Sequence, residues 1–288
     1  MEKAKWVYTF LAIAVLAIST TAPLVKLADA TAPVIAFYRM FFATCLVVFL
    51  VVSGRDSLLK IDGKRLAYCA VAGFLLGLHF ITWFSSLDYT SVASSVTLAT
   101  MQPLFAFIIG YFIYQERLNR GAALGALVSV LGGIVIGWGD YRVSGVALWG
   151  NLLALSAAFL ATVYFFVGQH ALKSVSLNVY TFYCYGFAAI AIALYCLVTG
   201  NAFSVVTHGD LLIFFLLALL PTLLGHSVLN YCTRFISVSL VSMAMLCEPV
   251  GASILAWLLL GSFPTVTQLV GGALTVLGVL YFLRKRGD

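Results

Sequence analysis

The chain alternates between long apolar runs and short polar segments along its whole length. Each run holds about 20 residues, which at about 1.5 Å per residue matches the ~30 Å hydrocarbon thickness of a bilayer. The intervening segments are too short to hold a water-soluble domain. The pattern therefore predicts an all-α polytopic membrane protein with ten transmembrane helices. Their expected bounds are 6–25, 33–52, 66–87, 92–114, 122–138, 146–167, 179–198, 211–232, 238–260 and 266–283.

Composition and charge agree with this picture. Hydrophobic residues make up 63% of the chain and charged residues 9%, whereas soluble domains carry about 25% charged residues. Of the 16 Lys and Arg residues, all but Lys26, Arg39 and Arg142 fall at span ends on one predicted side. The net charge of +6 therefore follows the positive-inside rule, which predicts both termini in the cytoplasm. Nucleic acid is not an expected partner.

Two short motifs mark corresponding points in the two halves of the chain. Gln102-Pro103 and Glu248-Pro249 each place a strongly polar side chain before a proline inside an apolar run, 146 residues apart. The same offset relates Ser91 to Ser237, Gly125 to Gly271 and Gly132 to Gly278. We expect two five-helix repeats, residues 1–144 and 145–288. Because each has an odd number of spans, the repeats should be inverted, with a central cavity between them.

Polar side chains inside the spans are the candidates for substrate binding, because polarity at membrane depth is costly and is kept where it functions. The predicted site, which includes neighbouring aromatic residues, consists of Tyr38, Arg39, His79, Trp83, Gln102, Tyr183, His226, Asn230 and Glu248. Four of these residues also have a structural interpretation: Arg39 as a residue that snorkels outward or fixes a loop carbonyl, His79 and His226 as helix-to-helix hydrogen bonds, and Glu248 as a buried packing element.

Two of these residues carry specific hypotheses. Arg39, about 9 Å into the second span from its outer end, could anchor a carboxylate or phosphate through its forked guanidinium. Glu248, about 15 Å into the ninth span, could couple transport to protons or bind a cationic group of the substrate. The glycines of the fifth and tenth spans are expected to serve as scaffold or as a dimer contact.

Other classes of function have weaker support. The chain has no H-E-x-x-H, G-x-S-x-G or G-x-x-x-x-G-K-[ST] motif, so an intramembrane enzyme is a remote alternative and direct use of ATP is not expected. The six cysteines all fall within predicted spans and none forms C-x-x-C. We interpret them as small apolar residues and expect no disulfide, no metal site and no cofactor.

The chain resembles the drug/metabolite transporter superfamily, in particular its EamA-type members, over essentially its whole length. The resemblance rests on Phe37-Tyr38-Arg39, Gln102-Pro103, Glu116-Arg117, Gly125–Gly133, Gly225-His226 to Asn230, Glu248-Pro249-Val250-Gly251 and Gly271-Gly272. The chain departs from the pattern at Ser262, where the second repeat often has a glutamate matching Glu116. The resemblance implies a basket-like bundle with a central cavity that exports or exchanges small metabolites, amino acids among them, across the cytoplasmic (inner) membrane of a prokaryote.

We therefore expect a secondary transporter of small metabolites that works by alternating access, as an exporter or an exchanger. A multidrug or cationic-compound efflux carrier is the alternative. The expected partners are the lipid bilayer, a small-molecule substrate and protons as the coupling ion, and both a monomer and a dimer remain open. The sequence does not identify the substrate.

Overall fold

A computed structural model of the chain describes residues 2–54, 56–58, 61–138, 145–201, 203, 207–261 and 263–286, so that Arg142 and Ser262 lie outside the described residues. All regular structure in these ranges is helical. The elements are α1 (Glu2–Ser19), α2 (Thr21–Leu27), α3 (Ala32–Ser53), α4 (Gly63–Ser86), α5 (Val92–Ala99), α6 (Gln102–Tyr114), α7 (Arg120–Gly137), α8 (Val146–Ala171), α9 (Leu177–Thr199), α10 (His208–Leu217), η2 (Ala218–Ser227), α11 (Val228–Cys232), α12 (Val238–Met245), α13 (Glu248–Leu260) and α14 (Val266–Arg286).

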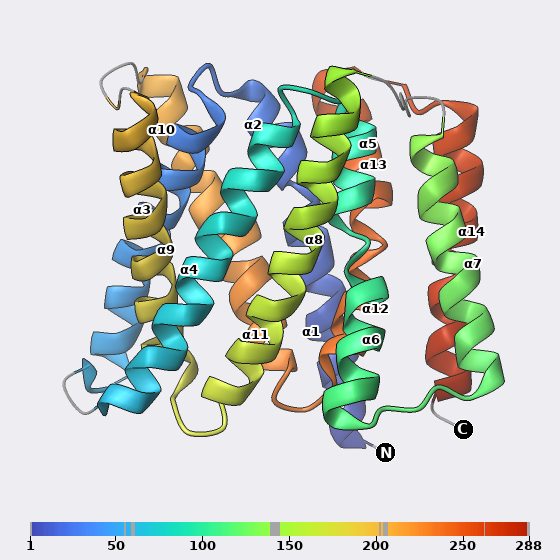
Figure 1. The fold of residues 1–288 in the computed structure, drawn as a ribbon, viewed down its shortest axis with the longest axis horizontal. Helices are drawn as coiled ribbons and strands as arrows, with labels where there is room; N and C mark the ends of the chain where they lie inside the picture. Colours follow the sequence, from blue (N-terminus) through green and yellow to red (C-terminus); the bar gives the residue numbers. More distant parts are fainter. Residues whose placement is uncertain are drawn as a thin grey trace.

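The described part of the chain contains ten helical segments long and apolar enough to cross a membrane, and each overlaps one predicted run. The expected all-α, ten-span architecture is confirmed. The segments stand side by side as a bundle, and both chain ends lie at the same end of it, the lower end in Figure 1.

Two spans are interrupted at the Gln-Pro and Glu-Pro motifs. α5 ends just before α6 begins at Gln102, and α12 ends just before α13 begins at Glu248. Pro103 and Pro249 occupy the second position of their helices, where a proline needs no amide hydrogen and its fixed φ favours helix initiation. The breaks therefore make Gln102 and Glu248 the first residues of two half-helices inside the bundle.

A further irregularity lies in the span built from α10, η2 and α11. η2 is a π-helical segment that contains Pro221, a residue that cannot donate a backbone hydrogen bond. The hydroxyl of Thr222 donates to the carbonyl of Leu217 at 2.8 Å and so satisfies one carbonyl in the disturbed turn. A side-chain carbon at Gly225 would lie 2.5 Å from Ile18, so this segment packs closely against the end of α1, where the first span is also broken.

Glycines hold α7 and α14 together at one edge of the bundle (Figure 1). A Cβ on Gly132 would lie 2.7 Å from the carbonyl oxygen of Gly271, and one on Gly278 would lie 2.9 Å from that of Gly125. Such close backbone approach is a main source of packing energy between helices in a membrane. The predicted scaffold role of these glycines agrees with this contact.

A polar junction joins three helices at the lower end of the bundle. The Arg286 guanidinium, at the end of α14, donates to the hydroxyl of Ser237 at 2.7 Å and lies 3.5 Å from the carboxylate of Glu116, just after α6. Ser237 caps α12, and Ser239 in α12 donates to the carbonyl of Ala106 in α6 at 3.3 Å. The junction therefore ties the half-helices α6 and α12 to the scaffold helix α14.

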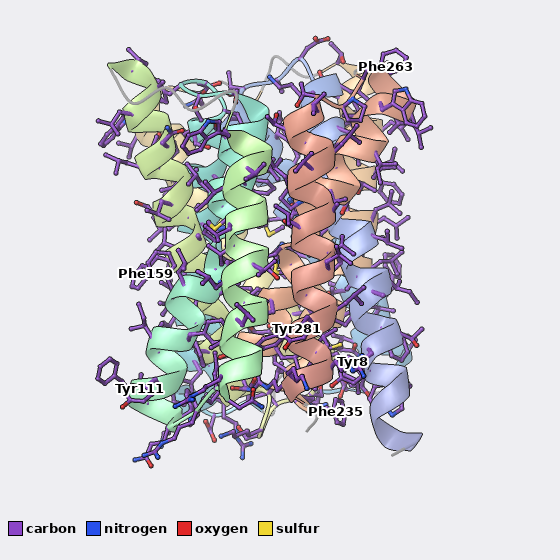
Figure 2. The ribbon with its side chains drawn as sticks, turned by 90° about the vertical axis from the view of Figure 1, so that its right-hand side faces the viewer. Tyr8, Tyr111, Phe159, Phe235, Phe263 and Tyr281 are labelled. Carbon is purple, nitrogen blue, oxygen red and sulfur yellow. The ribbon has the colours of Figure 1, made fainter. Side chains whose placement is uncertain are left out.

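The outer surface of the bundle is apolar and aromatic. Figure 2 shows Tyr8, Tyr111, Phe159, Phe235, Phe263 and Tyr281 projecting outward around α7 and α14, and all six are exposed. Exposed apolar side chains in this quantity would be unfavourable in water but suit contact with lipid.

Candidate functional site

The starts of α6 and α13 meet at a small cavity inside the bundle. Its volume is about 10 Å³, which is roughly the room that one water molecule needs. The lining residues come from five of the ten spans: Ile18, His79, Trp83, Ala99, Thr100, Gln102, His226, Met245 and Glu248. The cavity is too small for a metabolite, so a bound molecule would require the helices around it to move apart.

Gln102 and Glu248 place polar side chains in this lining while being almost fully buried, at 2% and 3% exposed. The Gln102 amide nitrogen donates to the carbonyl of Ala99 at 3.5 Å, whereas its Oε1 has no partner among the described residues. The backbone carbonyl of Glu248 accepts from Ser19 Oγ at 3.3 Å. This contact fixes the start of α13 against the break in the first span.

An aromatic and imidazole cluster forms another wall of the cavity. His79 lies parallel to Trp83 with ring centroids 5.7 Å apart, and its centroid is 6.5 Å from that of His226. His226 stacks on Phe165 at 6.2 Å. Nδ1 of His226 and Nε1 of Trp83 have no hydrogen-bond partner in the described part of the chain. The two histidines, which come from different halves of the chain, therefore lie close together in this wall.

The tautomer of His79 follows from its contact with α8. Its Nδ1 lies 2.9 Å from the carbonyl oxygen of Ala157, and a carbonyl can only accept. Nδ1 therefore carries the proton, and Nε2 of the neutral ring is an acceptor.

Arg39 lies behind the cavity wall rather than in it. Its side chain is completely buried, its Nε donates to Thr222 Oγ1 at 2.8 Å, and its guanidinium carbon lies 4.3 Å from the centre of the Phe80 ring. The two terminal guanidinium nitrogens have no partner among the described residues. The Phe80 ring in turn lies 5.6 Å from the ring of His226, which lines the cavity, so Phe80 separates Arg39 from the cavity wall.

Asn230 also lies one layer away from the cavity. Its amide nitrogen hydrogen-bonds the hydroxyl of Tyr164, and donates to the carbonyl of His226 at 2.8 Å. Asn230 is therefore hydrogen-bonded to His226, which lines the cavity.

Tyr38 and Tyr183 are not brought to the cavity. The ring of Tyr38 stacks on Phe214 with centroids 5.1 Å apart, and its hydroxyl donates to the carbonyl of Phe203 at 3.4 Å. The hydroxyl of Tyr183 donates to the carbonyl of Leu58 in the α3–α4 connection at 2.9 Å. Both hydroxyls therefore fasten connecting segments at the ends of the bundle.

Sequence reasoning missed four residues of the lining: Ile18, Ala99, Thr100 and Met245. Ala99 and Met245 are 146 residues apart, so the repeat offset applied around the Gln-Pro and Glu-Pro motifs would have found this pair. Ile18 directly precedes Ser19 and Thr20, where the first span breaks, and only the packing of that break against η2 places it at the cavity.

Comparison with known sequences decides the family. The profile of the EamA-like transporter family matches residues 5–138 and again residues 148–284. The chain belongs to this family. It is a multi-pass membrane protein of a transporter family, and the family and the relatives described next are transporters, not enzymes.

Several curated proteins are similar to this EamA-family chain. An uncharacterized transporter of Bacillus subtilis (strain 168), YdfC, is 29% identical over 229 residues, covering 78% of this chain and 73% of that protein. A protein of Streptantibioticus cattleyicolor named "Probable terminal-alkyne amino-acid exporter" is 25% identical over 230 residues, covering 78% and 74%. The riboflavin transporter ImpX of Fusobacterium nucleatum is 27% identical over 194 residues, covering 64% and 63%.

A solved structure shares the fold. A chain described as "Crystal structure of protein" superposes with a TM-score of 0.82 and 21% sequence identity, covering 98% of each chain. This EamA-family chain therefore has a fold already observed in a crystal.

Proposed function

We propose that the chain is a secondary transporter that carries small metabolites, such as amino acids, across the cytoplasmic membrane of a prokaryote by alternating access, as an exporter or exchanger. The observation that carries the proposal is the meeting of two half-helix starts, at Gln102 and Glu248, around a closed cavity inside a bundle of ten spans. Interrupted helices that meet in this way are typical substrate sites of secondary transporters.

Alternating access requires two halves that move against each other, and contacts of α7 and α14 support the proposed inverted repeats. Gly125 faces Gly278, and Gly132 faces Gly271. Residue 125 corresponds to residue 271, and residue 132 corresponds to residue 278. Exchanging the two halves therefore turns the first contact into the second and the second into the first. Such reciprocal contacts are what a twofold axis produces, and the family profile also matches the chain twice.

The proposed orientation places the lower end of the bundle in the cytoplasm. The loops at that end carry Arg117, Lys173 and Arg234, and both termini lie there (Figure 1). The positive-inside rule then favours cytoplasmic termini.

Glu248 is our candidate for coupling transport to protons. A carboxyl group that lines a closed cavity can take up a proton or pair with a cationic group. Each of these two events would favour a different arrangement of the half-helices. The alternative function, efflux of cationic compounds, is supported by the same residue, because Glu248 contributes the formal negative charge of the lining.

Reconstitution tests the proposed function. The purified protein is placed in liposomes loaded with one metabolite at a time, and counterflow of the labelled metabolite is measured across a panel of amino acids, amines, carboxylates and vitamins. We expect saturable counterflow of at least one of them. Absence of counterflow for the whole panel, with protein shown to be folded and correctly inserted, would contradict a transport function.

A further inference from the structure

The hydrogen-bonding character of the cavity lining is unbalanced. Glu248, when ionised, can only accept hydrogen bonds, and Oε1 of Gln102 is an acceptor without a partner among the described residues. The Thr100 hydroxyl lies within 3.0 Å of the carbonyls of Val96 and Thr97, to which it donates, so that its remaining capacity is to accept. Nε2 of His79 is a further acceptor because Nδ1 carries the proton.

Donors in the same lining are few. The Trp83 indole N–H is a donor without a partner in the described part of the chain, and Nδ1 of His226 can serve either way. The Gln102 amide nitrogen has a second hydrogen besides the one it donates to Ala99. A molecule that satisfies this lining must therefore supply more donors than acceptors.

The charge of the lining also favours a cation over an anion. Arg39 could have favoured an anion, but the ring of Phe80 covers its guanidinium and its side chain has no exposed surface. Helix starts also favour anions. At α13, however, Glu248 itself is that anion, and at α6 the second residue is Pro103, which has no amide hydrogen to offer.

The rest of the lining suits an apolar body beside a cation. Ile18, Ala99 and Met245 offer aliphatic and thioether surface, and the Trp83 ring stacks on His79. Trp is the aromatic side chain that attracts cations most strongly when they lie over its ring.

We propose that the substrates of this site are organic amines, bound with the protonated nitrogen among the Glu248 carboxylate, Gln102 Oε1 and the Thr100 hydroxyl and with the hydrocarbon part against Trp83, Ile18 and Met245. An ammonium group has three donors and no acceptor, which complements an acceptor-rich lining. This inference rests on the proposed transport function, since the closed cavity must open to admit such a molecule. Amino acids belong to the class if their ammonium group is what the site recognises.

The test uses four small molecules with comparable unbranched hydrocarbon chains that differ in their polar groups: hexylamine, hexanol, hexanoate and norleucine. Binding to the purified full-length protein is measured by calorimetry and by the shift in apparent melting temperature, because a ligand that binds the folded state raises it. We expect hexylamine to bind and hexanol and hexanoate to bind at least tenfold more weakly. If norleucine binds as well as hexylamine, amino acids belong to the substrate class.

Two substitutions test whether hexylamine binds at Glu248. Glu248→Gln keeps the size of the side chain and removes its charge, and should weaken hexylamine binding about tenfold or more. Asp62→Asn is the matched control, because Asp62 is an exposed residue that caps α4 and Asn caps helices equally well. Hexylamine binding to Asp62→Asn should equal wild type.

Several results would overturn the proposal: hexanol or hexanoate binding as tightly as hexylamine, norleucine binding without hexylamine, unchanged hexylamine binding by Glu248→Gln, or no binding of any of the four. Counterflow of a metabolite without a basic nitrogen would reject the amine class and leave transport standing. Glu248-dependent amine binding without counterflow of any solute would reject transport and leave the binding site standing.

Discussion

Ser129 of α7 and Thr275 of α14 face each other across the glycine-packed edge of the bundle, with the Thr275 hydroxyl donating to the carbonyl of Ser129 at 3.4 Å. They are 146 residues apart, the offset that relates the two proposed repeats. A residue that contacts its own counterpart lies on a twofold axis. The proposed axis therefore passes between these two side chains, perpendicular to both helices.

Close packing at this axis should be sensitive to a single methyl group. A Cβ on Gly278 would lie 2.6 Å from the backbone nitrogen of Ser129, so Gly278→Ala must push the two helices apart. We expect a loss of about 1–3 kcal/mol, typical of overpacking, measured as a lower melting temperature in detergent. Gly63→Ala, where no atom lies within 4 Å of the added carbon, is the control and should melt as wild type or slightly higher.

The hydrogen bond between Arg39 and Thr222 should stabilise the fold. Thr222→Val removes the hydroxyl that accepts from Arg39 Nε and leaves a buried charged donor unsatisfied. The expected cost is about 1.5–3 kcal/mol, measured by thermal unfolding. Thr222→Ser keeps the hydroxyl and should recover most of the loss. Equal stability of the Val and Ser variants would show that this hydroxyl contributes nothing.

Arg39→Lys separates a binding role of Arg39 from its structural role. If the unpartnered guanidinium nitrogens receive a carboxylate once the cavity opens, this variant should transport a zwitterionic substrate about tenfold more slowly, because lysine cannot provide the forked geometry. Transport of an amine without a carboxylate should be unchanged. The measurement is initial rates in proteoliposomes, and unchanged rates for both substrates would leave Arg39 with the structural role alone.

Proton coupling through Glu248 predicts a specific loss of function. Glu248→Gln retains shape and hydrogen bonding but cannot titrate. If Glu248 carries the coupling proton but does not bind the cationic group of the substrate, this variant should lose accumulation driven by a proton gradient and retain counterflow at equal pH on both sides. If Glu248 binds the amine, counterflow should fall together with binding. Wild-type accumulation in Glu248→Gln, at wild-type affinity, would remove Glu248 from the coupling mechanism.

Orientation can be tested directly. A protease site appended to the C-terminus should resist cleavage in intact cells and be cut in inside-out membrane vesicles, because the basic lower end is proposed to face the cytoplasm. A second site placed in the connection between α9 and α10, at the opposite end of the bundle, should show the reverse pattern. Cleavage of the C-terminal site in intact cells would invert the proposed topology.

The sequence predicted the spans well, because the length of an apolar run is set by membrane thickness and needs no knowledge of neighbours. It also identified Gln102, Glu248, His79, Trp83 and His226, all of which line the cavity, since polar residues at membrane depth are scarce. The sequence could not show that Arg39 and Asn230 lie behind the residues that line the cavity. Which face of a helix points toward the cavity depends on packing between elements far apart in sequence. The sequence did not predict the π-helical form of η2 either. Pro221 indicates a disturbed turn, but it does not indicate which hydrogen bonds replace the lost one.

The polar junction of Arg286, Glu116 and Ser237 lies at one end of a bundle that we propose to consist of two repeats. The positions 146 residues away from Arg286 and Glu116 are occupied by Asp140 and Ser262, residue types that cannot make an equivalent ion pair. Separating the end of α6 from α14 at the lower end would break this partly exposed ion pair, which is worth up to about 1 kcal/mol. If opening of the lower end separates these helices, the ion pair favours the shut form of that end by up to about fivefold.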